Sequence, residues 1–267
     1  MNLSKKTAAE RVKIARHPGR PKTADYIEGI IEHFIPFAGD RKYGDDESIL
    51  GGIGLFNDIP VTVIGHCKGH DLQENINMRF GMPNPEGYRK AERLMLQAEK
   101  FGRPLITFVD TPGAYPGKEA EERGQAEAIA RCIATMSRLK VPIISVFIGE
   151  GGSGGALAIG VSDRIIMLEN SIYSILSPEG FSSILWKDST RWEEAAEVMK
   201  LTASELQKLG ICDLIITEPE EGAHANPDLI FTKVKKAIWQ ELKPLLKESG
   251  ENLAKSRYRK LIRIGKN

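Results

Sequence analysis

The glycine-rich segment from Gly149 to Gly155 is the part of the sequence whose residue types and spacing best suit chemistry. Glycine lets the backbone turn tightly and approach a ligand closely. A helix that begins here would add unsatisfied N–H groups and the positive end of its dipole. The segment therefore predicts a site in which backbone amides, those of Gly154 and Gly155 among them, stabilise an oxyanion or an enolate.

The same segment also fits the dinucleotide-binding fingerprint. Gly149-x-Gly151-x-x-Gly154 follows a predicted strand and precedes a predicted helix, and Glu169 lies near the end of the next strand. This interpretation would make the chain an NAD-dependent oxidoreductase. Against it, the segment lies in the middle of the chain, and the helix predicted after it is short.

A third motif overlaps the first two. Gly151-x-Ser153-x-Gly155 matches the nucleophile elbow of a serine hydrolase, and Asp213 and His224 are the only formal candidates for the rest of a triad. Close packing between a helix and a strand is a purely structural explanation of the same glycines. The segment taken alone leaves all four interpretations open.

A second loop, Asp110–Gly117, follows another apolar strand. The run from Gly113 to Lys118 is one residue too short for a P-loop, and Glu119 stands where Ser or Thr would hold magnesium. The amides of Gly113 and Ala114 are instead candidates for a second cluster of donors. A turn stiffened by proline is the structural alternative.

Three predicted strands position these loops: Pro104–Val109, Val141–Ile148 and Arg164–Leu168. Strands that are apolar throughout are typical of a parallel sheet covered on both faces. Parallel strands place their carboxyl ends along one edge, where ligands of α/β proteins usually bind. We therefore expect both glycine loops to lie at the same edge.

The flanking segments predict the rest of the architecture. Ile49–Phe56 and Ile59–His66 flank Asn57-Asp58 and predict a hairpin. Apolar residues at helical spacing predict a helix over Asp25–Phe37, and prolines after N-cap residues predict helix starts at Asn84-Pro85, Ser177-Pro178 and Asn226-Pro227. We expect one domain of residues 1–267, with a helical segment 1–40, a core 41–220 and a helical extension 221–267.

The composition excludes several broad classes of protein. The 37 basic and 36 acidic residues nearly cancel, which argues against binding nucleic acid or a membrane through bulk charge. No apolar run approaches the roughly 18 residues that span a bilayer, and the N-terminus lacks the apolar stretch of a signal peptide. We therefore expect a cytoplasmic protein that binds neither nucleic acid nor membrane.

No metal site is predicted. Cys67, Cys132 and Cys212 are far apart, so neither a disulfide framework nor a zinc ribbon is expected within the chain. His66 and His70 lie close to Cys67, but no further ligands accompany them. We interpret this group as structural.

Seven segments occur in a fixed order along the chain: Ala38–Arg41, Ile64–Gly69, Phe80–Ala91, Asp110–Gly117, Glu121–Gln125, Ile148–Gly160 and Ser177–Gly180. Together they closely resemble the alpha subunits of the carboxyltransferase of bacterial acetyl-CoA carboxylase. The resemblance extends from about His17 to the C-terminus. Each motif alone is ambiguous, but seven in order are highly specific.

The resemblance implies a crotonase-like α/β fold, a spiral of ββα units with helical N- and C-terminal extensions. It also implies that carboxybiotin on a carrier protein gives its carboxyl group to acetyl-CoA, which forms malonyl-CoA for fatty acid synthesis. The enolate of the acetyl thioester and the ureido anion of biotin then need stabilising. Gly154 and Gly155 match the glycine pair that faces biotin, and Gly113 and Ala114 remain a candidate second cluster.

The resemblance implies several partners as well. A beta subunit with a zinc ribbon would hold the thioester enolate, and a biotin carboxyl carrier protein and a biotin carboxylase would complete the system. An α2β2 heterotetramer is expected, in which this chain contributes half of an active site. The candidate substrate-binding residues around the amides are Gly151, Gly152, Ser153, Tyr115, Pro116 and Gly117.

Overall fold

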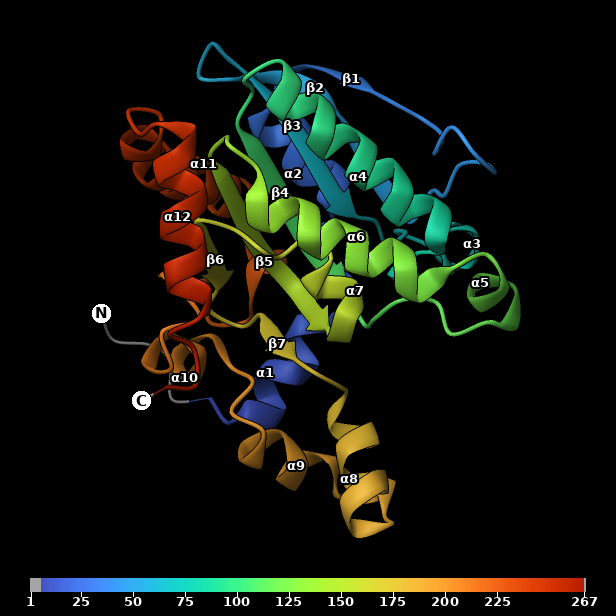
Figure 1. Ribbon diagram of the computed structural model, residues 1–267. Helices are drawn as coiled ribbons and strands as arrows, with labels where there is room; N and C mark the ends of the chain where they lie inside the picture. Colours follow the sequence, from blue (N-terminus) through green and yellow to red (C-terminus); the bar gives the residue numbers. More distant parts are fainter. Residues whose placement is uncertain (1–5, 267) are drawn as a thin grey trace.

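A β-sheet with helices on both faces runs through the middle of the computed structural model, which describes residues 6–266 (Figure 1). The strands are β1 (Glu32–Pro36), β2 (Ile49–Phe56), β3 (Ile59–His66), β4 (Leu105–Thr111), β5 (Ile143–Gly152), β6 (Arg164–Leu168), β7 (Ile172–Ser174) and β8 (Leu214–Ile216). Their order in the sheet is β1-β2-β3-β4-β5-β6-β8, and β7 pairs with the end of β5.

The helices alternate with these strands along the chain. They are α1 (Ala8–Ala15), α2 (Thr23–Ile30), α3 (Leu72–Asn77), α4 (Pro85–Lys100), α5 (Lys118–Glu122), α6 (Gln125–Arg138), α7 (Ser153–Leu157), α8 (Pro178–Trp186), α9 (Trp192–Val198), α10 (Ala203–Lys208), α11 (Pro227–Leu245) and α12 (Gly250–Leu261). Short 3-10 turns add η1 (Arg79–Gly81), η2 (Ser189–Arg191) and η3 (Ala223–Ala225). Within residues 6–266, no helix has both the length and the apolar content to cross a bilayer.

The strand pairing confirms the parallel sheet. β3, β4, β5, β6 and β8 pair in parallel, one with the next. The predicted hairpin is confirmed too, because β2 and β3 pair antiparallel and Phe56 lies opposite Ile59. The carboxyl ends of β4 and β5 therefore lie side by side, which brings the two glycine loops to one edge of the sheet.

Two apolar cores, one on each face, explain why the central strands are apolar throughout. Leu105 and Val109 of β4 point into the core beneath α4 and α6, whereas Ile106 and Phe108 point into the core beneath α2 and α11. Figure 1 shows α4 and α6 crossing one face of the sheet. Because successive side chains of a strand alternate between faces, burial on both faces requires apolar residues at nearly every position.

The predicted starts of three helices are confirmed. α4, α8 and α11 begin with the proline that follows Asn84, Ser177 and Asn226. The Ser177 side chain accepts a hydrogen bond from Gly180 N, and the Asn226 side chain accepts one from Leu229 N. Near the C-terminus, α11 and α12 follow each other with a short connection between them.

The prediction of one helix over Asp25–Phe37 was wrong after Ile30. The chain there turns into β1, which pairs with β2, so the segment 1–40 is not wholly helical and the sheet begins before residue 41. Glycines in β2 make this pairing possible, because a Cβ added at Gly52 would lie only 2.2 Å from the Ile35 carbonyl oxygen. The helical periodicity of the segment gave no sign of this partner.

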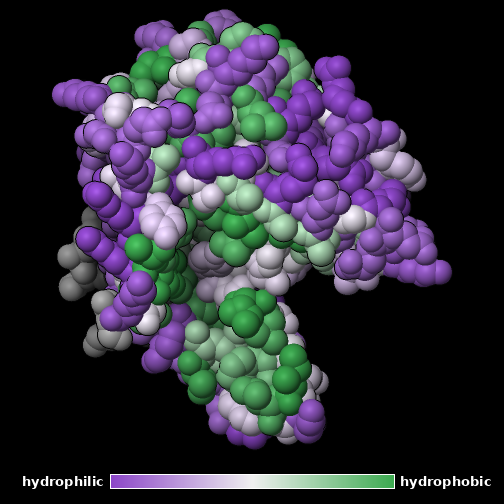
Figure 2. Space-filling view, viewed as in Figure 1, coloured by the Kyte–Doolittle hydropathy of each residue, from purple (hydrophilic) through white to green (hydrophobic). Residues whose placement is uncertain are grey.

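A lobe made of α8, η2 and α9 projects from the body of the molecule, at the bottom of Figure 1. Its surface is strongly apolar in Figure 2, where a notch separates it from the body. Ile184 and Leu185 of α8 are 62% and 60% exposed, and Ile175, just before the helix, is 79% exposed. Apolar side chains this exposed are unusual on a free protein surface and are typical of an interaction site.

Candidate active site

The glycine-rich segment divides between a strand and a helix. The loop predicted from Gly149 to Gly155 was wrong for its first half, because β5 continues to Gly152 and α7 begins at Ser153. Two neighbours keep residues 149–152 extended: β7 pairs with residues 150–152, and Thr111 of β4 pairs with Gly151. The short helix predicted after the segment likewise starts within it, at Ser153, and ends at Leu157.

The end of β5 and the second loop touch each other, backbone against backbone. A Cβ added at Gly152 would lie 2.1 Å from the Pro112 carbonyl oxygen, and one added at Gly155 would lie 2.7 Å from Ala114 N. No side chain is accommodated at such distances, so glycine is required at both positions. The structure thus brings together the two predicted amide clusters.

The amides at this contact differ in availability. Gly113 N–H already donates to Thr111 Oγ1 at 3.0 Å, which in turn donates to the Gly113 carbonyl oxygen at 2.7 Å. Ala114 N–H has no hydrogen-bond partner among residues 6–266. Gly154 and Gly155 lie in the first turn of α7, where N–H groups have no intrahelical partner. Ala114, Gly154 and Gly155 are therefore better suited than Gly113 to hold an anion.

The predicted substrate-binding residues Tyr115, Pro116 and Gly117 occupy the outer part of the second loop. Tyr115 N donates to the Pro83 carbonyl oxygen at 3.0 Å, and the Tyr115 carbonyl oxygen accepts from Gln125 Nε2 at 2.9 Å. The guanidinium of Arg79 lies over the Tyr115 ring. A Cβ added at Gly117 would lie 2.2 Å from the Tyr115 ring. These contacts hold the outer loop to the α4 and α6 side of the sheet and leave Pro116 exposed.

A buried group of charges lies directly beside the glycine segment, and sequence reasoning assigned it no role. Lys68 Nζ lies 2.7 Å from Asp110 Oδ1 and 3.0 Å from Glu150 Oε2. Asp110 Oδ1 also accepts a hydrogen bond from Glu150 N at 3.0 Å. A Cβ added at Gly149 would lie 2.4 Å from the same Asp110 oxygen, so the first glycine of the segment makes room for a carboxylate.

The charges of this group support one another. Burial by itself would lower the pKa of Lys68, but the charges of Asp110 and Glu150 outweigh it and raise that pKa. Burial by itself would raise the pKa of Glu150, but Lys68 and Arg16 outweigh it and lower that pKa. Lys68 and Glu150 are therefore both charged at neutral pH. The signal in the sequence was a lone acid, Glu150, flanked by glycines inside an apolar strand.

The triad of a serine hydrolase is not assembled. Ser153 is exposed at φ +54°, and its strand–turn–helix setting does resemble a nucleophile elbow. His224, however, stacks on His17 with ring centroids 3.7 Å apart, and Asp213 forms an ion pair with Lys260. Asp213 precedes β8 and so lies at the amino ends of the parallel strands, whereas Ser153 lies at the carboxyl ends. The hydrolase interpretation was therefore wrong.

The dinucleotide interpretation is not supported either. α7 has five residues, too few to form the helix that carries a pyrophosphate in a Rossmann unit. Glu169, the candidate acid for the ribose, is buried and lies 3.5 Å from Arg11. Its carboxylate therefore serves the contact between α1 and the end of β6.

His66, Cys67 and His70 do not share one environment, because the first two are buried and His70 is exposed. Burial lowers the pKa of His66 to about 3 and raises the pKa of Cys67 to about 12, so both are neutral. His70 is exposed and lies 3.2 Å from Asp25. No group of three or more His, Cys, Asp or Glu side chains within residues 6–266 is arranged to hold a metal ion.

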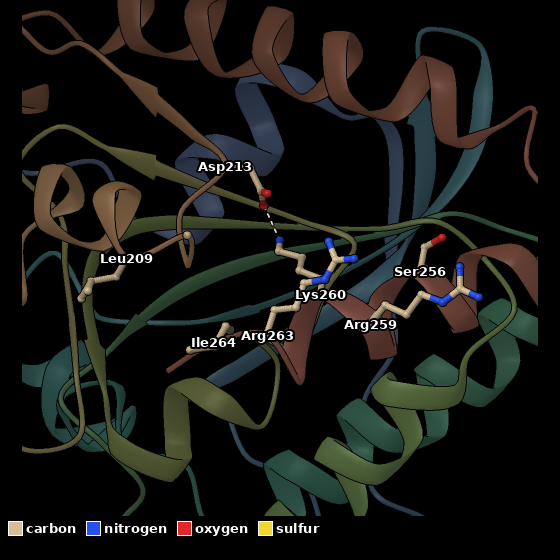
Figure 3. A pocket seen from close by; sticks show the side chains of 8 residues that line it. Leu209, Asp213, Ser256, Arg259, Lys260, Arg263 and Ile264 are labelled. Carbon is tan, nitrogen blue, oxygen red and sulfur yellow. Dashed lines mark hydrogen bonds and ion pairs between the residues drawn. The ribbon is translucent and has the colours of Figure 1, made fainter. Parts of the chain in front are cut away.

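A basic pocket lies near the C-terminus (Figure 3). Arg259, Lys260 and Arg263 line it, together with Asp213, and Lys260 Nζ also lies 3.3 Å from the Asp163 carbonyl oxygen. Asp213 and Asp163 directly precede β8 and β6, so they mark the amino ends of the parallel strands. The basic tail therefore lies at the opposite end of the sheet from the glycine loops.

Sequence comparison places the chain among known proteins. Residues 2–265 match the family described as acetyl co-enzyme A carboxylase carboxyltransferase-like. The chain is 58% identical over 259 residues to the acetyl-coenzyme A carboxylase carboxyl transferase subunit alpha of Geobacillus sp. (strain WCH70), a match that covers 97% of this chain and 80% of the relative. The subunit alpha of Clostridium botulinum (strain Alaska E43 / Type E3) is 57% identical over 256 residues, 96% of this chain and 93% of the relative.

Solved structures resemble the fold. Transcarboxylase 12S superimposes with a TM-score of 0.68 at 18% identity, over 90% of this chain and 46% of that one. The malonate decarboxylase MdcD–MdcE hetero-dimer of Pseudomonas has a chain that superimposes with a TM-score of 0.67 at 20% identity, over 92% of this chain and 98% of that one. The chain thus spans less than half of the transcarboxylase polypeptide. These neighbours confirm the predicted crotonase-like fold.

Fold and sequence agree with the arrangement of the site. Two glycine loops meet at the carboxyl edge of a parallel sheet, and their backbones lie in close contact there. The family match covers nearly the whole chain, and the relatives share more than half of their residues with it over that length. The chain belongs to the acetyl-CoA carboxylase carboxyltransferase family, among the alpha subunits.

Proposed function

We propose that this chain is the alpha subunit of a carboxyltransferase that moves the carboxyl group of carboxybiotin to acetyl-CoA and so forms malonyl-CoA for fatty acid synthesis. The observation that carries the proposal is the contact between Gly155 and Ala114, with Ala114 N 2.7 Å from a Cβ added at Gly155. It gathers unpartnered amides of two loops at one point. Such a cluster stabilises negative charge without any side-chain nucleophile.

The chain's own contribution is to hold the carboxyl donor and to stabilise charge on its oxygen. Carboxybiotin, carried on another protein, supplies the activated carboxyl group. The amides of Gly154 and Gly155 would donate to the donor's oxygen as the carboxyl group departs, and Ala114 N–H would add a third hydrogen bond. Each such donor is worth on the order of 3 kcal/mol of transition-state stabilisation.

The geometry suits a planar donor group that is carried in from outside. Ser153 is exposed and Gly154 is half-buried, so the first turn of α7 opens to solvent. Glycine at positions 151, 152 and 155 leaves the backbone bare where a Cβ would otherwise stand. The segment Gly151–Ser153 would then contact the donor, and Tyr115–Gly117 would form the outer wall of the same site.

The proposal requires several partners. A beta subunit with a zinc ribbon would hold the acetyl thioester, and a biotin carboxyl carrier protein and a biotin carboxylase would deliver the donor. Support comes from the relatives, which are named as subunits, and from neighbours described as a hexamer and a hetero-dimer. We expect an α2β2 heterotetramer in the cytoplasm.

The reverse half-reaction tests the function. Malonyl-CoA is decarboxylated to acetyl-CoA with a free biotin derivative as acceptor, and acetyl-CoA is measured. We expect no activity from this chain alone and activity when a zinc-ribbon beta subunit is added. Activity without the partner, or tight binding of NAD, would contradict the proposal.

Substitution of Ser153 separates amide chemistry from nucleophilic chemistry. We expect Ser153→Ala to keep most of the carboxyl transfer activity, because only the backbone of this residue serves the site. Ser153→Gly should also be active and should raise the unfolding midpoint, since a side chain at φ +54° costs roughly 1 kcal/mol that glycine does not pay. A loss of more than about a hundredfold in kcat for Ser153→Ala would reinstate a nucleophilic serine.

A further inference from the structure

Arg16 lies where three parts of the molecule meet. It is the C-terminal cap of α1, and its guanidinium binds two acids on different elements. Arg16 Nε lies 2.7 Å from Glu150 Oε1 on β5, and Arg16 Nη1 lies 2.6 Å from Glu179 Oε1 on α8. Arg16 Nη2 adds a third hydrogen bond, at 3.3 Å, to the other oxygen of Glu179. One planar side chain thus joins the amide strand to the projecting lobe.

The Glu150 end of this link is fixed. The second carboxylate oxygen of Glu150 lies 3.0 Å from Lys68 Nζ, and the Glu150 N–H donates to Asp110. The residue stands between Gly149 and Gly151 in β5, and its side chain is only 11% exposed. Both carboxylate oxygens and the backbone of Glu150 are therefore held in place. The Arg16 guanidinium is thus fixed relative to β5, the strand that leads into the amides of Gly154 and Gly155.

The Glu179 end belongs to the lobe. Glu179 is in the first turn of α8, whose start is capped by Ser177. The backbone reaches α8 from β7, which pairs with residues 150–152 of β5. α8 is therefore connected to the amide strand through the backbone of β7 and through Arg16, while α9 places Ala196 in one apolar cluster with Val12 of α1. Three residues, 175–177, separate β7 from α8, and Arg16 adds a side-chain link beside this short connection.

The lobe also borders the site. Figure 1 places α7 just above β7 and the lobe below it, and Figure 2 shows the notch between lobe and body in the same view. Ser153, in the first turn of α7, is exposed to solvent. The orientation of α8 therefore decides the width of the notch beside the amides.

We infer that Arg16 is a positioning residue for carboxyl transfer, which holds the lobe at a fixed orientation relative to the amides of Gly154 and Gly155 by joining Glu150 to Glu179. The inference rests on the proposed function, since it assigns Arg16 a role in the same site. Its guanidinium does not touch the donor. It acts by setting the space that the donor enters, and small displacements of that kind have large effects on rate.

The fork of arginine is essential to this role. A guanidinium presents donors on two edges of one plane, so it bridges two carboxylates in a defined geometry, whereas an ammonium is a point charge. Arg16→Lys keeps the charge and can satisfy Glu150 or Glu179, but not both with this geometry. Glu179→Gln removes the charge at the lobe end only and leaves Glu150 bound to Arg16 and Lys68.

The chain offers a matched control. Lys13 Nζ of α1 lies 2.7 Å from Glu193 Oε1 of α9, so this ion pair also joins α1 to the lobe. It does not involve Glu150 or the amide strand, and both of its side chains are exposed. Glu193→Gln therefore removes a lobe contact of similar kind without breaking the link to the site.

The first test uses the complex of the full chain with its zinc-ribbon partner. We expect Arg16→Lys and Glu179→Gln each to lower kcat for malonyl-CoA decarboxylation about tenfold, and to change KM for malonyl-CoA little. The double variant should be no worse than Arg16→Lys alone, because both changes cut one link. Glu193→Gln should retain wild-type kcat. Equal kcat values for Glu179→Gln and Glu193→Gln would overturn the inference.

The second test does not depend on activity. Hydrogen exchange is measured on peptides that cover residues 149–157 and 175–186. We expect both link variants to exchange faster than wild type in the two regions together, and Glu193→Gln to leave residues 149–157 unchanged. Wild-type exchange in the link variants would refute the coupling. If the wild-type complex transfers no carboxyl group, the proposed function fails, and the exchange data still decide whether Arg16 couples the lobe to the strand.

Discussion

Replacing Gly155 by alanine is expected to lower kcat for carboxyl transfer on the order of a hundredfold. The added Cβ would lie 2.7 Å from Ala114 N, 2.8 Å from the Gly113 carbonyl carbon and 2.8 Å from Tyr88 Oη. The first two are backbone atoms that cannot rotate away, so the two loops must separate. Separation removes the Ala114 amide from the cluster and misplaces the others, and an oxyanion donor displaced by about 1 Å costs this much.

Gly154→Ala is the control for this experiment. A Cβ added at Gly154 meets only the Ile129 side chain, at 3.5 Å, which is an ordinary contact. We expect this variant to retain most of its activity and to keep the unfolding midpoint of the wild type. The decarboxylation assay with the beta subunit measures both variants. Similar losses at the two positions would mean that the contact between the loops is not what aligns the amides.

Replacing Lys68 by methionine is expected to destabilise the fold by about 3 kcal/mol or more. Lys68 is the cation between Asp110 and Glu150, and all three side chains are at most 14% exposed. Its removal leaves two buried carboxylates close together with one cation fewer, and an uncompensated buried charge typically costs about 3–5 kcal/mol. For a chain of this size, the unfolding midpoint should fall by roughly 6–12 °C.

Two further variants test the physical reason. Lys118→Met removes an exposed lysine that pairs with Glu122, and it should leave the midpoint nearly unchanged. Adding Asp110→Asn to Lys68→Met neutralises one of the stranded carboxylates, so part of the lost stability should return. If the double variant is as unstable as the sum of the two single ones, the destabilisation of Lys68→Met does not come from charge. Calorimetry or circular dichroism at pH 7 measures all of these midpoints.

Local sequence patterns correctly predicted the elements whose signals lie within the segment itself. The hairpin of residues 49–66 was predicted at its correct bounds, because its alternation and its polar turn are contained in the segment itself. The strand Arg164–Leu168 and the proline starts of α4, α8 and α11 were found for the same reason. β1 was missed, since the apolar spacing of residues 25–37 fits a helix and only the glycines of β2 reveal a strand partner.

The candidate site divides in the same way. Sequence motifs located Gly154, Gly155 and Ala114 and predicted that their loops would share an edge of the sheet, as parallel strands require. The same motifs allowed an oxidoreductase and a hydrolase. Geometry removed the hydrolase, because the partners that Ser153 would need lie elsewhere, and an acid bound to a lysine cannot orient a distant histidine.

The sequence by itself determined the family and the chemical character of the site. Glycines between a strand and a helix mark positions where the backbone comes close to another backbone or to a ligand, and such positions are visible in the sequence. Only the tertiary structure decided which amides are unpartnered, and that Lys68, Asp110, Glu150, Arg16 and Glu179 form one connected group. These residues come from five separate elements or loops, and charge pairing between distant segments leaves no periodicity in a sequence. The glycine segment that can hold an anion can thus be predicted from the sequence, but the charged residues that hold this segment in place are identified only from the tertiary structure.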